Sequence, residues 1–303
     1  MKIDLHIHSI FSDGRMGVED IFHTAKERNV DLLSITDHDS LDSQQSAGDM
    51  AARYGMLYLS GIELNVTYSH PRYQQGKTVS LDFLGYGYDI RHGPLAEKLT
   101  ALRDYREKRA RIILDRVNEE LAREGLPRLT PEDMREIQNS VDGTFGRPHI
   151  ADYLVRKGLA GTRQDAFDRY LVKCNVPKMP LSLAEASSLI RDAGGKVIFA
   201  HPGNPRGTSL VALTSSVKEQ QEIIRETMLP HIDGVECWHS SHDAETSTSY
   251  LSFTRELGLM ATGGSDCHQQ PLLLGTVRVP EWVADQFDFH EGHLGMPRDS
   301  RRS

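Results

Sequence analysis

Two histidines near the N-terminus, His6 and His8, are spaced so that both imidazoles can reach one cation. Residues 3–8 alternate apolar and polar side chains with the period of a β-strand. Asp4, His6 and His8 therefore share one face of the predicted strand, and the apolar residues share the other. The pair alone is a modest signal, because a histidine in a strand is more often a hydrogen-bonded core residue than a metal ligand.

The same arrangement, an apolar run that ends in acids and histidines, recurs along the chain. Independent placement would not repeatedly put carboxylates and imidazoles at the ends of predicted strands. Nitrogen and oxygen donors without a thiolate set suit Zn²⁺, Mn²⁺ or Fe²⁺, and the candidates exceed one four-coordinate site, so we expect more than one metal. These further candidates are Asp13, His38, Glu63, His201, Asp266 and His268.

Short predicted strands that alternate with helices must position these residues. This order favours parallel βαβ units, and reactive side chains at the carboxyl ends of strands are typical of a (β/α) barrel. The predicted strands are 3–8, 31–36, 56–62, 78–84, 196–200, 232–236 and 259–262. The predicted helices of the barrel are 17–28, 44–54 and 183–193.

The alternation stops in the middle of the chain and at its end. Residues 95–183 are helical in pattern, with an amphipathic helix at 103–124, and are expected to form an insertion or cap. The barrel is expected to comprise residues 1–94 and 184–285. Residues 286–303 show no periodicity and are expected to be a disordered tail.

The overall composition excludes several classes of protein. With 35 Lys and Arg against 43 Asp and Glu, the net charge of −8 argues against a dedicated binder of duplex DNA. No apolar run approaches the ~18 residues of a membrane span, and the first residues resemble a strand more than a signal peptide. Three cysteines without framework spacing fit a reducing cytoplasm. The oligomeric state stays open.

Six motifs, taken together and in order, resemble the PHP (polymerase and histidinol phosphatase) superfamily from Met1 to about Val279. The resemblance implies an α/β fold, a distorted (β/α)7 barrel of the PHP type with a helical insertion, and two or three divalent metal ions. The motifs are His6-x-His8, Ser12-Asp13-Gly14, Thr36-Asp37-His38-Asp39, Gly61-Ile62-Glu63, Ala200-His201-Pro202-Gly203 and Gly264-Ser265-Asp266-Cys267-His268.

The resemblance also distributes the candidate ligands among three metals, with Glu63 bridging the first two. The first metal would be held by His6, His8, Glu63 and Asp266. The second would be held by Glu63 and His201, and the third by Asp13, His38 and His268. The chain departs from the pattern at Asp82, where many relatives place a histidine of the second site; a carboxylate there would favour Mn²⁺ or Fe²⁺ over Zn²⁺.

Further residues are assigned to the substrate and to proton transfer. Arg147 and His149, within the insertion, resemble an Arg-x-His element that contacts phosphate, and a guanidinium can grip two phosphate oxygens. Asp266 is expected to accept a proton, and His201 or His242 to assist the leaving group. Glu236 matches a family position near the pocket, whereas His239 is expected to be exposed.

The predicted activity is hydrolysis of a phosphomonoester by a hydroxide that bridges two metals. The order of the motifs and the helical insertion resemble the branch of the family that acts on nucleotides, which implies a nucleoside 3′,5′-bisphosphate, AMP or the 5′ end of a short RNA as substrate. Alternatives are a phosphatase or phosphodiesterase of a cyclic or simple sugar phosphate, and a histidinol phosphatase. An amidohydrolase that cleaves C–N bonds and a non-catalytic metal-binding domain are weaker alternatives.

Overall fold

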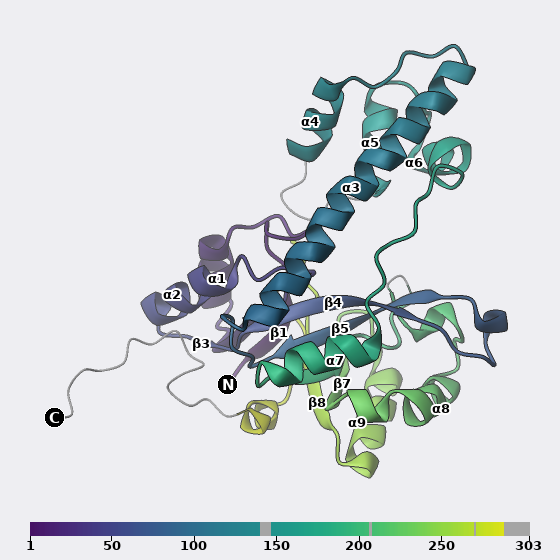
Figure 1. Cartoon of the computed structure of the whole chain (residues 1–303). Coiled ribbons are helices and arrows are strands. Elements are labelled where there is room, and N and C mark those ends of the chain that lie inside the picture. The colour runs from purple at the N-terminus through teal and green to yellow at the C-terminus, as the bar shows by residue number, and fades with distance from the viewer. Residues whose placement is uncertain (140–146, 206–207, 270, 288–303) are drawn as a thin grey trace. The chain divides into compact units, whose positions relative to one another are not determined.

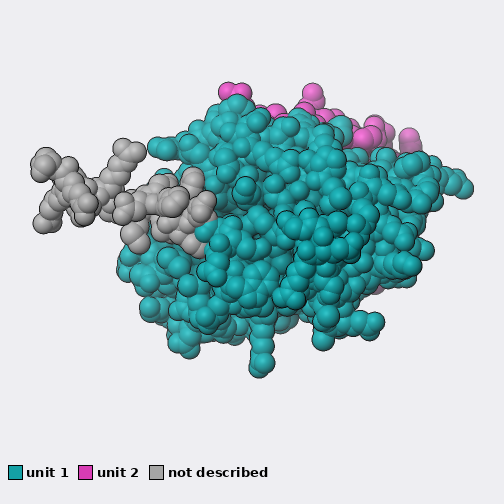
Figure 2. Space-filling model, turned by 90° about the horizontal axis from the view of Figure 1, so that it is seen from below, with its two compact units in different colours: residues 1–96, 180–303 teal, residues 97–179 magenta. Residues whose placement is uncertain are grey.

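The computed structural model describes residues 1–139, 147–205, 208–269 and 271–287 (Figure 1). Two compact units are present: Met1–Ala96 with Pro180–Ser303, and Glu97–Met179, coloured teal and magenta in Figure 2. Of the expected tail 286–303, only residues 286 and 287 lie within the described part. No helix among the described residues is long and apolar enough to cross a membrane.

The strands of the first unit pair into two sheets. One sheet is parallel, in the order β1 (Ile3–Ile7), β2 (Leu32–Ile35), β3 (Leu57–Tyr58). The other has the order β4 (Gly61–Tyr68), β5 (Val79–Tyr86), β6 (Lys196–Phe199), β7 (Gly234–His239), β8 (Met260–Gly264). In it β5 runs antiparallel to both neighbours, so the expectation of uniformly parallel units was wrong there. The short loop from β4 to β5 contains no crossover helix, and a hairpin connection makes strands antiparallel.

The expected strand 56–62 is two strands in different sheets. The chain leaves the first sheet after Tyr58 and enters the second at Gly61. Glu63 is therefore the third residue of β4 and not a residue beyond a strand end. The short run is apolar except at Ser60 and Gly61, and these two residues are too few to reveal the break.

The two sheets are joined at the edge where the candidate ligands lie. Isolated β-bridges pair Ile7 with Cys267 and His38 with Glu63. The buried hydroxyl of Tyr86 donates a hydrogen bond of 2.6 Å to the carbonyl of Leu5 on β1. The fold is thus mixed α/β, but the described strands are not paired into a closed ring, and the seven-stranded barrel is not confirmed.

Amphipathic helices bury the outer faces of both sheets. Helix α1 inserts Ile21, Phe22 and Ala25 into an apolar cluster with α2 and the residues of β1 and β2. The helices of this unit are α1 (Val18–Glu27), α2 (Gln44–Tyr54), α7 (Leu183–Asp192), α8 (Val217–Thr227) and α9 (Ala244–Leu257). The short helical turns are η1 (Gln74–Gly76), η3 (Leu210–Ala212), η4 (Leu229–His231) and η5 (Glu281–Gln286).

The second unit is helical and has a core of its own, which includes Ile113, Val117 and Leu121. Helix α3 begins at Gly93, ten residues before the expected start of 103–124, because Leu95, Leu99 and Leu102 extend its apolar face. The elements are α3 (Gly93–Arg123), whose first four residues belong to the first unit, α4 (Pro131–Asn139), α5 (Arg147–Arg156), α6 (Arg163–Ala166) and the π-helix η2 (Phe167–Leu171).

Close approach of β8 to β1 requires glycine at position 264. A Cβ there would lie 2.3 Å from the backbone nitrogen of His6 and 2.4 Å from its Cβ. Neither atom is at the end of a flexible side chain, so the backbone itself would have to move.

We expect Gly264→Ala to lower the free energy of unfolding by ~1–3 kcal/mol, the usual cost of overpacking. Gly93→Ala is the matched control, because a Cβ at Gly93 would meet no atom within 4 Å. Chemical denaturation of both variants measures the difference. Equal stability of the two would show that β1 and β8 are not tightly packed at this point.

Candidate metal centre

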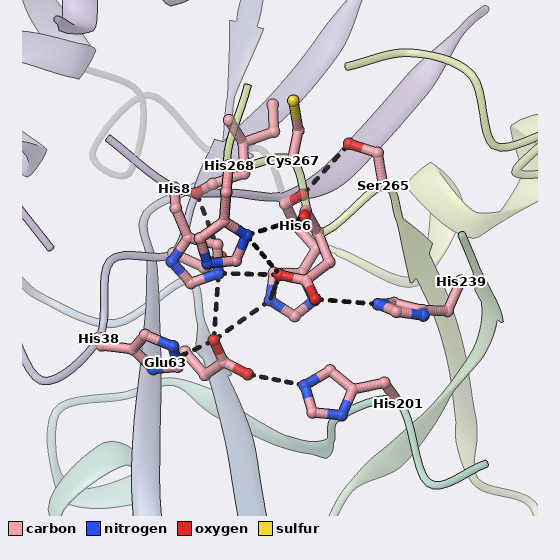
Figure 3. A network of polar contacts seen from close by, with 12 residues as sticks. His6, His8, His38, Glu63, His201, His239, Ser265, Cys267 and His268 are labelled. Carbon is pink, nitrogen blue, oxygen red and sulfur yellow. Dashed lines mark hydrogen bonds and ion pairs between the residues drawn. The ribbon is translucent and has the colours of Figure 1, made fainter. Parts of the chain in front are cut away.

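Three imidazoles surround one oxygen of the buried carboxylate of Glu63 (Figure 3). The distances to Oε2 are 3.3 Å from Nε2 of His6, 3.2 Å from Nε2 of His8 and 3.3 Å from Nδ1 of His38. His6 lies on β1 and His8 directly follows its last residue; both reach the same oxygen of Glu63, as their period-two spacing predicts, and both are fully buried.

Asp266 completes the innermost group of donors. Its Oδ1 lies 3.1 Å from Nε2 of His8 and 3.4 Å from Nε2 of His6. One donor atom each from His6, His8, Glu63 and Asp266 falls within 4.8 Å of the other three. These are the four residues assigned above to the first metal.

A second group lies toward the surface. It joins His8, Asp13, His38 and His268, again with one donor atom each within 4.8 Å of the others. Asp13 Oδ1 is 3.1 Å from Nε2 of His268, and Asp13 Oδ2 is 3.8 Å from Nε2 of His38. The side chains of Asp13, His38 and His268 are partly exposed, so this end of the cluster is accessible to solvent.

The second oxygen of Glu63 faces another histidine. Its Oε1 lies 3.0 Å from Nε2 of His201, so the two oxygens of one carboxylate reach different donors. Asp82 is buried on β5 and forms a donor group with His38 and Glu63 within 4.8 Å. Asn65 on β4, directly opposite Asp82 in the strand register, donates a hydrogen bond of 2.6 Å to Asp82 Oδ1.

The electrostatics of the cluster fit bound cations. Burial alone would raise the pKa of Glu63, but the neighbouring His38 and His6 outweigh it and hold this pKa well below its usual range. The pKa of Asp266 is depressed in the same way, against the effect of burial, chiefly by His6.

The imidazole of His8 provides a separate observation that fits metal binding. Its Nε2 is buried close to two carboxylates yet makes no hydrogen bond. Nitrogen and carboxylate donors that converge in this way suit a divalent transition metal, which can accept the lone pair that no hydrogen bond uses.

Buried carboxylates behind the cluster hold the backbone that carries it. Asp37 accepts hydrogen bonds from the backbone N–H of Ser9 at 2.8 Å and from the hydroxyls of Ser9 and Ser12, both at 2.7 Å. It thereby fixes the turn that presents Asp13. Asp4 likewise holds the segment that carries Asp266, because it accepts a hydrogen bond of 2.8 Å from the backbone N–H of Ser265.

Glu236 on β7 connects two of the histidines. Its Oε1 lies 3.0 Å from Nδ1 of His6, and its Oε2 accepts a hydrogen bond of 2.8 Å from the backbone N–H of His201. A carboxylate on the far nitrogen of a ligating histidine fixes the orientation of its ring and raises its basicity. The sequence placed Glu236 near the pocket without a role, and gave Asp4 and Asp37 none.

Two of the candidate ligands have backbone conformations that L-residues rarely adopt. His201 has φ 26° and Asp266 has φ 52°. Such strain persists only where surrounding contacts enforce it, and it is common at functional sites. Here the hydrogen bond from His201 to Glu236 and those from Ser265 to Asp4 supply the constraint.

Two histidines, His239 at the end of β7 and His242 just beyond it, differ from expectation. His239 was expected to be exposed but is buried, with Nε2 3.3 Å from Asp266 Oδ2. In His242, Nδ1 donates to the carbonyl of Cys237 and Nε2 accepts from the backbone N–H of Gly203. Burial is the main cause that lowers the pKa of His242 to about 4. A neutral ring with both nitrogens bonded to backbone is poorly suited to donate a proton to a leaving group.

The predicted phosphate ligands lie in the second unit, at the start of α5. Arg147 stands over the ring of Phe167, with 5.7 Å between Cζ and the ring centroid. Burial and the charge of Arg147 lower the pKa of the neighbouring Arg109, which donates hydrogen bonds to Val176 and Asn175. Sequence reasoning missed this gathering of cations; the assignment of Arg147 and His149 to substrate remains a prediction.

Comparison with known proteins agrees with the motifs. The 5′-3′ exoribonuclease Rnm of Escherichia coli (strain K12) is 28% identical over 274 residues, which cover 88% of this chain and 85% of the relative. The 3′,5′-nucleoside bisphosphate phosphatase of Chromobacterium violaceum is 28% identical over 271 residues, covering 88% and 87%. A crystal structure from Bifidobacterium adolescentis, proposed to be a metal-dependent phosphoesterase, superposes with TM-score 0.71 and 27% identity over 94% of both chains.

A family model described as the PHP domain matches residues 4–171, more than half of the chain. This match includes the strands that carry His6, His8 and Glu63 and most of the helical unit. The chain belongs to the PHP domain family.

Proposed function

We propose that this protein is a metal-dependent phosphoesterase that removes a phosphate from a nucleotide. The candidate substrates are a nucleoside 3′,5′-bisphosphate, AMP or the 5′ end of a short RNA. The observation that carries the proposal is the convergence of His6, His8 and His38 on one oxygen of Glu63. The names of the E. coli and C. violaceum relatives support phosphate esters of nucleotides and RNA.

Two or three divalent ions, Mn²⁺, Fe²⁺ or Zn²⁺, would be held by the donor groups around Glu63. Ions bound there would lower the pKa of water and so would supply a nucleophile near neutral pH. We assign the first ion to the buried group with Asp266, the second to Glu63, His201 and Asp82, and the third to Asp13, His38 and His268. The left-handed backbone of His201 and Asp266 supports the role of these two donors, because such strain clusters at functional sites.

The side chains of the protein itself hold the substrate and move its protons. Arg147 and His149 contact the phosphate and offset charge on its oxygens during attack. Asp266 accepts the proton of the attacking water. The two roles assigned to His201, metal ligand and acid, exclude each other at Nε2, and the ligand role is preferred because that atom faces Glu63.

The weaker alternatives find less support. A carboxylated lysine, expected in many amidohydrolases, has no counterpart among the described donor groups, in which Glu63 takes the central place.

We also propose that the two sheets are parts of the distorted (β/α)7 barrel of the PHP type. The bridges from Ile7 to Cys267 and from His38 to Glu63 support this, because they join the first sheet to the segments at both edges of the second.

Replacement of a central ligand should abolish turnover without unfolding the protein. We expect His8→Asn and Asp266→Asn to lower kcat by more than about 100-fold, beyond the loss typical of residues that only orient ligands. Phosphate release from adenosine 3′,5′-bisphosphate, AMP and a 5′-phosphorylated oligoribonucleotide measures this. His23→Asn is the control, since His23 is exposed on α1. Normal turnover by either central variant would exclude the metal-centred mechanism.

The carboxylate at position 82 should set the preference for the metal. We expect Asp82→His to shift relative affinity from Mn²⁺ toward Zn²⁺, because imidazole is the softer donor. Metal analysis after equilibration with equal concentrations of both ions measures the shift. Asp89→His, exposed beyond β5, serves as control. An unchanged ratio in Asp82→His would show that Asp82 does not bind a metal.

Arg147 should act on substrate binding. We expect Arg147→Gln to lower kcat/KM by about 10–100-fold, the value of ~1.5–3 kcal/mol for a charge-assisted hydrogen bond. Metal content should stay at the wild-type level. Arg128→Gln, an exposed residue of the same unit, should be neutral. A kinetic profile of Arg147→Gln identical to that of the control would remove Arg147 from the site.

A further inference from the structure

His239 is the last residue of β7 and lies beside the metal cluster without belonging to the predicted ligand set. It pairs in register with Gly264 of β8, two residues before Asp266. Its ring is buried, with centroid distances of 6.0 Å to His6 and 5.2 Å to His201. In Figure 3 the dashed line from the ring of His239 marks its contact with a carboxylate oxygen of Asp266.

The contacts of His239 fix which ring nitrogen carries the proton. The backbone N–H of Ser241, 3.1 Å from Nδ1, can only donate, so Nδ1 must accept. The hydroxyl of Ser241, 2.7 Å from the same nitrogen, can rotate to suit. In the neutral ring the proton therefore lies on Nε2, and Nε2 is 3.3 Å from Asp266 Oδ2.

Because of the Nε2–H of His239, the two oxygens of Asp266 have different partners. Oδ1 faces the histidines, at 3.1 Å from His8 and 3.4 Å from His6, whereas Oδ2 receives the N–H of His239. An N–H that occupies one oxygen disfavours binding of a cation through both. Outer contacts of this kind hold ligating carboxylates in place.

We propose that His239 is a positioning residue that reserves Oδ2 of Asp266 and makes this carboxylate bind the first metal through Oδ1 alone. This inference rests on the proposed function in one respect: it assumes that Asp266 binds a metal. His239 itself donates no lone pair to a metal, since its Nδ1 is taken by Ser241 and its Nε2 carries the proton. The comparable donor group of His6, Glu236 and His239 is thus a hydrogen-bonded support and not a separate site.

Substitution of His239 by glutamine or methionine tests the proposal with two side chains of similar length. Gln retains an N–H donor for Oδ2 and Met lacks one. We expect Met to weaken binding of Mn²⁺ to the tightest site by about 10–100-fold, while Gln stays close to wild type. Competition with a chelating dye measures the affinity in apo-protein, and elemental analysis at saturating Mn²⁺ measures the stoichiometry, which should not change. Ser241→Ala should leave affinity unchanged, because its backbone N–H remains.

Several results would overturn the proposal. Equal affinity of the Met and Gln variants would show that the donor is irrelevant, and loss of one equivalent of metal in both would make His239 a ligand. If the Met variant does not fold, long-range ¹H–¹⁵N spectra of the wild-type apo-protein decide: an Nδ1–H tautomer at His239 refutes the inference, and an Nε2–H tautomer supports it. The binding measurements are independent of phosphate release, so a protein that binds metal but hydrolyses none of the substrates would refute only the proposed function.

Discussion

The structure depends on keeping the carboxylate of Glu63 charged in the interior. Burial of a carboxylate without compensation is expensive, and the side chain here is 1% exposed. Compensation comes from four imidazoles that reach its two oxygens at 3.0–3.3 Å. Because these imidazoles come from β1, the turn after β2 and the turn after β6, both sheets must meet at this one point.

That requirement explains why the junction between the sheets is built from polar groups. Glu63 and His38 form the bridge between β4 and the segment after β2, and Asp39 donates its backbone N–H to the carbonyl of Glu63 at 2.8 Å. On the other side His8 donates its backbone N–H to the carbonyl of Cys267 at 3.1 Å. The donors of the site are thus part of the backbone connection between sheets, so the site and the fold stabilise each other.

A structural feature could be predicted from the sequence where the pattern that encodes it is local, and not where it depends on residues far apart in the chain. Alternation over residues 3–8 is local, and it correctly placed His6 and His8 on one face. The same alternation pointed Cys267 away from its neighbours, and that side chain lies in an apolar cluster. The sequence analysis did not predict the break at Leu59–Ser60 or the antiparallel direction of β5, because an apolar run does not reveal which sheet it joins. The contacts of His239 and Asp37 were not predicted for another reason. Their partners, Asp266 and Ser9, are 27 and 28 positions away in the sequence.

The antiparallel β5 also explains how the proposed second site could vary independently of the proposed first. Antiparallel pairing sets Asp82 directly opposite Asn65, and Asn65 lies two residues after Glu63, on the same face of β4. The hydrogen bond of 2.6 Å between Asn65 and Asp82 orients the carboxylate toward the Glu63 side of the cluster. A neutral imidazole at position 82 would offer one lone pair, so it could bind a cation only by giving up the hydrogen bond from Asn65, and Asn65 and Asp82 are best understood as one unit. Variation of such a cross-strand pair would change one proposed ligand while leaving β1, β8 and the proposed first site untouched.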